Sequence, residues 1–232
     1  MNKNILIIGG SSGIGQALVE LLQDSNTIFV ANRTSEGIDI QKVTYIKYDT
    51  TEEPLDTSVL PDQLDGFVYC PGSINLRPFK GLKPETFLKD FEINVLGAVK
   101  SLQAVLKNLL ESPQASIVLF STVAVQTGMP FHASVAAAKG AIEGLTRSLA
   151  AEYAPKFRVN TIAPSITDTP LANKFLNNEV KLEKANERHP LKNIGSAKDI
   201  AHTARFLLSD ESKWMTGQIV HLDGGIGDLK TN

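Results

Sequence analysis

Short apolar runs alternate along this chain with longer stretches whose apolar residues recur every three or four positions. The first run, Asn4–Ile8, is almost wholly apolar and stops at two glycines, which is typical of a strand buried on both faces of a sheet. The stretch that follows, Gly13–Asp24, has helical spacing and predicts an amphipathic helix. Further apolar runs predict strands at Thr27–Ala31, Val43–Tyr48, Gly66–Cys70, Ser116–Phe120, Val159–Ile162 and Gln218–Leu222.

Long helices are predicted between the later strands, over Pro84–Leu110, Ala133–Tyr153 and Ala197–Leu208. Strands that alternate with helices favour a parallel sheet wound on both faces. We therefore expect an α/β fold with a doubly wound, Rossmann-like sheet of about seven strands in three layers. Residues 1–232 are expected to form a single dinucleotide-binding domain.

Two connections depart from this alternation. The segment Arg33–Lys42 is too short for a full crossover helix, and we expect a loop or a single turn there. The segment Leu171–Lys192 is polar, highly charged and mixed in period, which favours a mobile, lid-like insertion over a part of the core.

Composition narrows the function classes. The net charge of −2 gives no electrostatic case for binding nucleic acid or an anionic membrane. The single cysteine, Cys70, excludes an internal disulfide, and with four scattered histidines it predicts no metal site. The apolar run Ile5–Ile8 is too short for a signal peptide or a membrane span. We expect a soluble, cytoplasmic protein.

A glycine-rich turn joins the first strand to the first helix. It comprises Gly9, Ser11, Ser12, Gly13, Ile14 and Gly15. Glycines permit a tight turn and a close approach of the backbone to a ligand, and the helix N-terminus offers free N–H groups to a pyrophosphate. Glycines at this spacing alone are a weak signal, but their place after the first strand predicts binding of a dinucleotide.

The end of the second predicted strand bears on which dinucleotide binds. An acidic residue there would bind a ribose 2′-hydroxyl and repel a 2′-phosphate. This chain has Asn32 and Arg33 instead, and a guanidinium suits bidentate contact with a phosphate. We therefore expect NADP to be preferred over NAD; the alternative is that Arg33 is a solvated surface residue.

Further motifs follow one another in a characteristic order. Asn94 lies in Ile-Asn-Val-Leu-Gly, Thr122 precedes position 135 by thirteen residues, and Lys139 follows it by four. A Pro-Ser-Ile-Thr-Asp-Thr segment begins at Pro164, and a C-terminal run ends in Asp-Gly-Gly at Gly225. Together these motifs resemble the short-chain dehydrogenase/reductase family over nearly the whole chain. The family is marked by Tyr-x-x-x-Lys with a serine upstream, and here Val135 stands at the tyrosine position.

The resemblance implies a role for each matching residue. Lys139 would bind the nicotinamide ribose, Thr122 would replace the serine that polarises the carbonyl, and Asn94 would hold a water of the proton relay. The cofactor would also be contacted near its adenine and nicotinamide ends by Asp49, Thr50, Cys70, Gly72, Pro164, Ile166 and Thr169. Relatives commonly assemble as homotetramers or homodimers through the helices that correspond to Pro84–Leu110 and Ala133–Tyr153.

Val135 leaves the source of the proton open. In the family the tyrosine exchanges a proton with the substrate oxygen, and a general acid contributes about 10²–10⁴-fold to the rate. His132 is a candidate substitute because histidine titrates near neutral pH, although a helix-entry histidine can equally be structural. Ser134 points about 100° away on a helix, and Tyr69 is expected to pack in the core.

Two functions fit these residues. The first is an NADP(H)-dependent oxidoreductase that acts on a small carbonyl or alcohol through an altered proton path. The second is a catalytically silent NADP(H)-binding protein that serves as a sensor or an assembly partner. Lys139, Asn94 and the glycine-rich turn support cofactor binding in both cases, so these residues do not separate the two.

Overall fold

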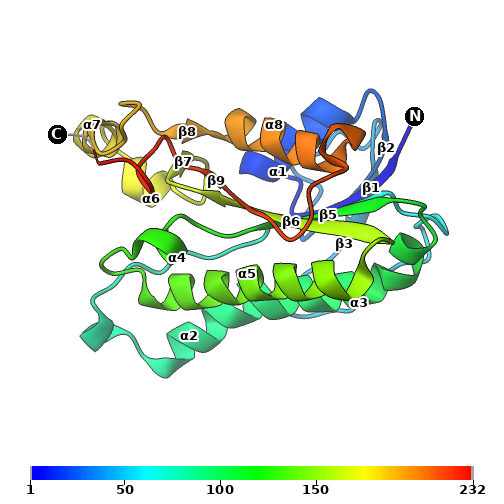
Figure 1. The fold of residues 1–232 in the computed structure, drawn as a ribbon, viewed down its shortest axis with the longest axis horizontal. Helices are drawn as coiled ribbons and strands as arrows, with labels where there is room; N and C mark the ends of the chain where they lie inside the picture. Colours follow the sequence, from blue (N-terminus) through cyan, green and yellow to red (C-terminus); the bar gives the residue numbers. More distant parts are fainter. Residues whose placement is uncertain (1, 231–232) are drawn as a thin grey trace.

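The computed structural model, which describes residues 2–230, contains a sheet of seven parallel strands in the order β3-β2-β1-β4-β5-β6-β9 (Figure 1). The predicted doubly wound sheet and its strand runs are thereby confirmed, with ends that shift by one or two residues. The strands are β1 (Asn4–Ile8), β2 (Thr27–Asn32), β3 (Thr44–Lys47), β4 (Gly66–Tyr69), β5 (Ala115–Phe120), β6 (Phe157–Pro164) and β9 (Ile219–Leu222).

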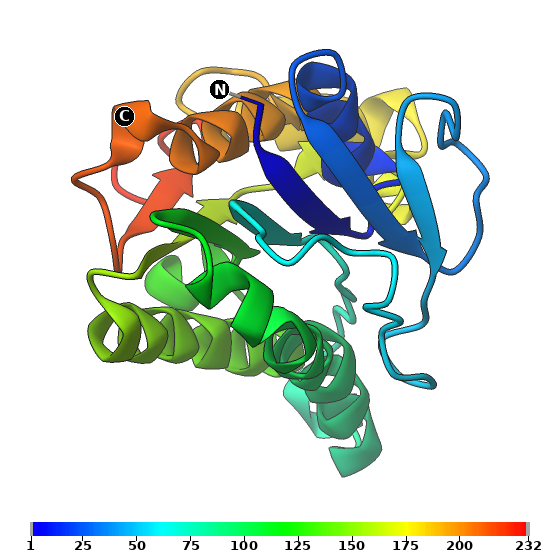
Figure 2. The same cartoon turned by 90° about the vertical axis from the view of Figure 1, so that its right-hand side faces the viewer.

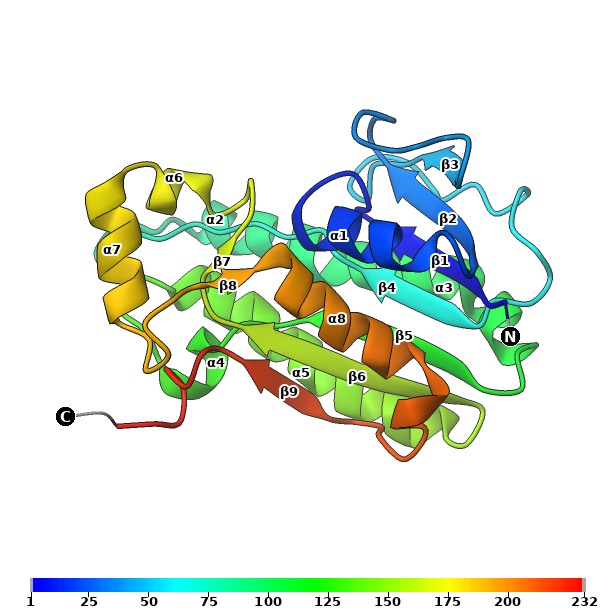
Figure 3. The ribbon, with the colours of Figure 1, turned by 90° about the horizontal axis from the view of Figure 1, so that it is seen from above.

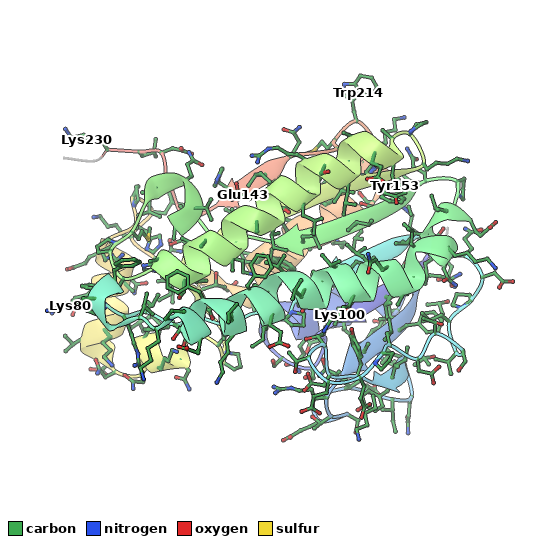
Figure 4. The ribbon with its side chains drawn as sticks, turned by 90° about the horizontal axis from the view of Figure 1, so that it is seen from below. Lys80, Lys100, Glu143, Tyr153, Trp214 and Lys230 are labelled. Atoms are coloured by element: carbon green, nitrogen blue, oxygen red, sulfur yellow. The ribbon has the colours of Figure 1, made fainter. Side chains whose placement is uncertain are left out.

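Helices cover both faces of the sheet and make three layers (Figure 2). One face carries α1 (Gly13–Leu22) and α8 (Ala197–Leu208). The other carries α2 (Pro84–Phe91), α3 (Gly97–Leu110) and α5 (Ala133–Tyr153). Seen from below, α5 lies beside α3, with Glu143 and Tyr153 on the first helix and Lys100 on the second (Figure 4).

The central strands are buried on both faces, and this explains why their sequences are continuous apolar runs. In β1, Leu6 and Ile8 pack in the hydrophobic cluster under α3 and α5. Their neighbours Ile5 and Ile7 point the other way, into the cluster with α1 and α8. Because successive side chains of a strand alternate between faces, one short strand contributes to both cores.

The predicted helix Pro84–Leu110 is interrupted. A π-helical turn, η2 (Glu92–Leu96), separates α2 from α3, and it contains Asn94. An i+5 turn inserts one extra residue into a helix and is frequent at functional sites. The hydrophobic period alone does not reveal it, because the helix axis continues on both sides.

The connection from Arg33 to Lys42 contains no helix, as predicted. The segment from Leu171 to Lys192 instead folds into α6 (Asn173–Leu176) and α7 (Glu179–Glu187). The side chain of Asn178 caps α7 by accepting a hydrogen bond from the backbone of Lys181. Only Ala185 of α7 is buried, so the apolar periodicity that identifies a core helix is missing.

The remaining short elements are η1 (Phe79–Gly81), α4 (Ala124–Thr127), η3 (Asp210–Ser212) and the two-stranded pair β7 (Thr167–Asp168) and β8 (Gly195–Ser196). Within residues 2–230, no helix is both long and apolar enough to span a bilayer.

The carboxyl ends of the strands point toward the end of the molecule where α6 and α7 lie (Figure 3). β1 pairs with β2 on one side and with β4 on the other, so the winding direction reverses there. Open α/β sheets bind ligands at this reversal, beyond the carboxyl ends of the strands. The loops that leave β1, β4, β5 and β6 therefore enclose the candidate site.

Candidate functional site

Two adjacent cavities lie beyond the carboxyl ends of the strands. The first, which we call the turn cavity, has a volume of about 650 Å³ and lies over the loops after β1, β2 and β3. The second, the helix cavity, has about 470 Å³ and lies between the start of α5, the loop after β6, and α6–α7. Most of the residues predicted to bind a cofactor line the turn cavity: Gly9, Ser11, Ser12, Gly13, Ile14, Gly15, Asn32, Arg33, Asp49, Thr50, Cys70, Gly72 and Thr169.

The glycines of the first turn are required by its geometry. Gly9 and Gly13 have φ angles of 82° and 54°, a region that disfavours residues with a side chain. A Cβ atom on Gly15 would collide with the carbonyl oxygen of Gly9. The turn therefore keeps its shape only with glycine at these positions, and it exposes backbone to the cavity.

The N-terminus of α1 has unused hydrogen-bond donors at the turn cavity. The N-cap residue Ser12 makes no side-chain capping bond, and the first turn of the helix has no acidic residue. The free N–H groups and the positive end of the helix dipole favour an anion. This arrangement fits a pyrophosphate, as the sequence predicted.

Arg33 and Asp49 lie at the far end of the turn cavity. Arg33 is exposed, and it is the one cationic residue among the described residues that line this cavity. The pKa of Asp49 is lowered by hydrogen bonds from the backbone and side chain of Thr51, at 2.9 and 2.7 Å, and further by the charge of Arg33. The cavity thus offers a carboxylate and a guanidinium on neighbouring strand ends.

The helix cavity brings together the residues predicted for catalysis, apart from Asn94. Thr122, His132, Val135 and Lys139 all line it, as do Pro164 and Ile166 of the loop after β6. Val135 is only 4% exposed and presents an apolar wall where the family has a phenol. Among the described residues, none of the four tyrosines lines this cavity.

Lys139 is buried at the floor of the helix cavity. Its ammonium donates a hydrogen bond to the carbonyl oxygen of Phe120 at 2.9 Å. A Cβ placed on Gly72 would lie 3.6 Å from Lys139 Nζ, so the amine also borders the region shared with the turn cavity. Burial lowers the pKa of Lys139 to about 8.

Asn94 lines neither cavity, because its side chain is fully buried. Its amide donates to the backbone oxygen of Asp90 at 2.7 Å and to Ser73 Oγ at 2.9 Å, and its oxygen accepts from the backbone of Ser73 at 3.4 Å. In this arrangement Asn94 holds the loop after β4 against the π-helical turn.

Sequence reasoning missed the polar group beneath this loop. Ser73 lines the helix cavity and donates to Asp90 Oδ1 at 2.5 Å, and Asn75 donates to the same oxygen at 2.7 Å. Asp90 is fully buried, and its Oδ2 has no protein partner. The sequence does not indicate that Asp90 is buried, because an aspartate among lysine and glutamate residues of a helix is normally predicted to be exposed to solvent.

The other candidate proton donors have distinct surroundings. His132 lies three residues before Val135, and its Nδ1 contacts the oxygen of Pro130 at 2.8 Å. Its Nε2 makes no hydrogen bond with any of residues 2–230. The phenol of Tyr69 is in the core and donates to Ile93 O at 2.6 Å, which supports the packing role expected for it. His189 contacts Ser165 Oγ and Ala185 O at 2.8 and 2.7 Å and ties α7 to the loop after β6.

The two cavities share part of their walls. Ile14, Cys70, Gly72, Thr169 and Leu171 line both. Burial raises the pKa of the Cys70 thiol to about 12, so this residue is a neutral wall rather than a nucleophile. Within residues 2–230 no cluster of three metal-ligating side chains occurs. Fold and site together define a Rossmann-like α/β protein whose turn cavity fits a dinucleotide and adjoins a second cavity.

Comparison with known proteins identifies the family. The family profile described as "Enoyl-(Acyl carrier protein) reductase" matches residues 49–227. The 2,5-dichloro-2,5-cyclohexadiene-1,4-diol dehydrogenase of Sphingobium indicum is 31% identical, with 96% of each chain covered. A crystal structure of a short chain dehydrogenase family protein from Francisella tularensis has 29% identity and a TM-score of 0.90, and covers 99% of this chain and 100% of the other.

This chain belongs to the short-chain dehydrogenase/reductase family, as the resemblance of its motifs indicated. Another relative, "Inactive 2-(S)-hydroxypropyl-CoM dehydrogenase 2" of Xanthobacter autotrophicus, is 33% identical over 70% of this chain and 73% of its own. The relatives thus include both named dehydrogenases and one named inactive.

Proposed function

We propose that the protein is an NADP(H)-dependent oxidoreductase that interconverts a small carbonyl compound and its alcohol, with Val135 in place of the tyrosine. The observation that carries this proposal is the shared wall between the turn cavity and the helix cavity. A dinucleotide whose pyrophosphate lies at the N-terminus of α1 would reach Gly72 and Lys139 with its other end. Its reactive ring would then face a substrate in the helix cavity.

Arg33 supports the preference for NADP. Its guanidinium is exposed at the mouth of the turn cavity and can pair with a 2′-phosphate, whereas the strand end offers no carboxylate at positions 32 and 33 for a 2′-hydroxyl. At the other end, the ammonium of Lys139 would donate to the nicotinamide ribose. When bound, the nicotinamide supplies or accepts the hydride.

The protein side chains then have three tasks. The hydroxyl of Thr122 polarises the substrate oxygen. Beyond a long contact with the backbone of Ala124 at 3.4 Å, this hydroxyl has no hydrogen-bond partner among the described residues. His132 exchanges the proton through Nε2, which is free while Nδ1 is held by Pro130. Val135 packs against the substrate and excludes water from that side of the cavity.

A silent NADP(H)-binding protein is the alternative, and one observation favours it. Within the helix cavity Val135 supplies no proton, and the nearest tyrosine in sequence, Tyr153, lies at the opposite end of α5. In that case the turn cavity would still bind the cofactor, and the helix cavity would accept a ligand without turnover. The single domain, the cytoplasmic location and the homodimer or homotetramer stay predictions.

The test has two stages. Calorimetric titration of the full chain with NADPH and with NADH measures cofactor binding. Turnover is then measured on a panel of ketones and aldehydes, as the NADPH consumed and the alcohol formed. We expect tighter binding of NADPH, and turnover that falls by about 10²-fold or more in His132→Gln. The matched control is His202→Gln, an exposed histidine of α8.

The possible outcomes separate the hypotheses. Turnover that survives in His132→Gln would transfer the proton role to another group of the cavity. Binding of NADPH without turnover on the whole panel would favour the silent protein. A chain that binds neither nicotinamide would contradict both functions.

A further inference from the structure

The wall that α7 contributes to the helix cavity is cationic. Lys181, Lys184, Ala185 and Arg188 all line the cavity, at positions 0, 3, 4 and 7 of a helical repeat. Residues at this spacing share one face of a helix. Ala185 is buried against the cavity, so the three cations of the same face are directed to its mouth. Lys174 of α6 adds a fourth.

The acidic residues of α7 lie on another face. Glu179, Glu183 and Glu187 follow one another at a spacing of four, and none of them lines the cavity. Among the described residues, no aspartate or glutamate lines it at all. The i,i+4 pairs of α7 are therefore of like charge, which weakens an isolated helix. The charges of α7 are therefore segregated, with the cations on the face toward the cavity and the three glutamates away from it.

The cations of this wall are only partly used by the protein. Lys174 donates to Ile74 O at 2.7 Å, and Lys181 donates to Asn177 Oδ1 at 2.8 Å. Lys184 and Arg188 make no side-chain hydrogen bond or ion pair with any described residue. The contacts of His189 with Ser165 and Ala185 hold the end of α7 beside the cavity, so these two charges stay at its mouth.

Many of the other lining residues are apolar. They come from different segments, and among them are Ile74, Leu76, Val123, Met129, Phe175 and Ile226. A cavity with an apolar lining, the hydroxyl of Thr122 and the cations of α7 suits a molecule that carries both a carbonyl and an anionic group.

On the basis of the proposed function, we propose that the substrate of this site carries a carboxylate or phosphate group, which Lys184 and Arg188 bind at the mouth of the helix cavity. The carbonyl or hydroxyl group then lies beside Thr122. A guanidinium and an ammonium together recognise either oxyanion, because both present oxygen acceptors of negative charge.

Matched probes test the charge directly. The full chain, saturated with NADP⁺, is titrated by calorimetry with levulinate and with levulinamide, and separately with dihydroxyacetone phosphate and with dihydroxyacetone. Each pair differs only in the anionic group. We expect at least one acid to bind about tenfold more tightly than its neutral partner. The pair with the larger ratio identifies a carboxylate or a phosphate.

Variants locate the effect. Lys184→Met together with Arg188→Met keeps the apolar stems and should abolish the preference for the acid, with binding of the neutral partner unchanged. Glu183→Gln, on the other face of α7, and Lys198→Met, in the first turn of α8, are the matched controls and should preserve the preference. Circular dichroism verifies that α7 is retained.

Several results would overturn the inference: equal binding of acid and neutral partner, no binding of either acid, or a preference that survives in the double variant. Failure of the proposed function is a separate result, because NADPH binding is measured without these probes. If the chain prefers the acid but does not bind NADPH, the anion site is supported and the proposed oxidoreductase function is contradicted.

Discussion

The two cavities of this protein are adjacent but are built differently. The turn cavity is shaped mostly by backbone: glycines with positive φ, free N–H groups at the start of α1, and the ends of β2 and β3. The helix cavity is shaped by side chains that come from separate segments, from Ser73 and Thr122 to Arg188.

This difference has a functional consequence. A side-chain change in the helix cavity, such as the valine at position 135, leaves the backbone of the turn cavity intact. The ability to bind a dinucleotide and the ability to move a proton can therefore be lost separately. Variants in each cavity test that separation.

Restoring the phenol should have the largest effect. In Val135→Tyr the hydroxyl would lie one helical turn from Lys139, whose charge lowers the pKa of a nearby phenol. We expect the reductase rate to rise by up to about 10²-fold, which is the part of a general acid's contribution that His132 does not already supply, with NADPH affinity nearly unchanged. Val135→Phe adds the ring without the hydroxyl and should not raise the rate. Equal rates in the two variants would show that the phenol does not supply the proton, and a loss of NADPH affinity in Val135→Tyr would contradict the separation of the cavities.

A change in the glycine-rich turn should weaken cofactor binding without changing the helix cavity. In Gly15→Ala the new Cβ collides with the Gly9 carbonyl, and overpacking of this kind typically costs about 1–3 kcal/mol. NADPH should therefore bind about 10- to 100-fold more weakly by calorimetric titration. Gly144→Ala, on the exposed side of α5 with no atom within 4 Å, is the control and should leave binding unchanged.

A substitution of Arg33 tests the contribution of a side chain to cofactor binding in the turn cavity. Arg33→Ala should weaken NADPH binding by about tenfold and leave NADH binding nearly unchanged, because only NADPH carries the 2′-phosphate. Lys47→Ala removes an exposed cation at the end of β3 that does not line the cavity, and serves as the control. Equal losses for both cofactors would show that Arg33 acts through general attraction.

The smallest expected effect is on pH dependence. The pKa of Lys139 in the free protein is lowered to about 8, and binding of the ribose and phosphates favours the charged ammonium. Above about pH 8 the free protein loses this charge, so NADPH binding must take up a proton and weakens by up to about tenfold per pH unit. Calorimetry between about pH 7 and pH 9 measures this slope. An unchanged slope in Lys139→Met would assign it to another group.

Most of the fold was predictable because apolar runs and helical periods report burial directly. The strands β1 to β6 and the helices α5 and α8 lie where the pattern places them. The π-helical turn was not predictable, because helix continues on both sides of it and its residues have no distinct hydrophobic period. The helix α7 was also missed, since its organising period is carried by charge rather than by apolar residues.

Within the site, the residues found from sequence are those with a local signature. The glycines of the first turn and Arg33 were found from their places after the first two predicted strands, and Val135 and Lys139 from the family resemblance. All of them line the two cavities. Asp90 and Ser73 could not be found this way, because their contact joins residues seventeen positions apart across two elements.

The sequence by itself determined the order of strands and helices, the glycine-rich turn, the missing tyrosine and the membership of the family. The elements and the turn depend on residues close together in the chain, where spacing decides geometry, and the family depends on motifs that follow one another in order along it. Only the tertiary structure decided that Asn94 is buried behind the loop after β4, that the phenol of Tyr69 is in the core, and that the cations of α7 line the helix cavity. These features depend on how segments far apart in the chain pack together. The periodicity of apolar residues predicts which side of an element is buried, but not which polar or charged side chains of other elements it meets.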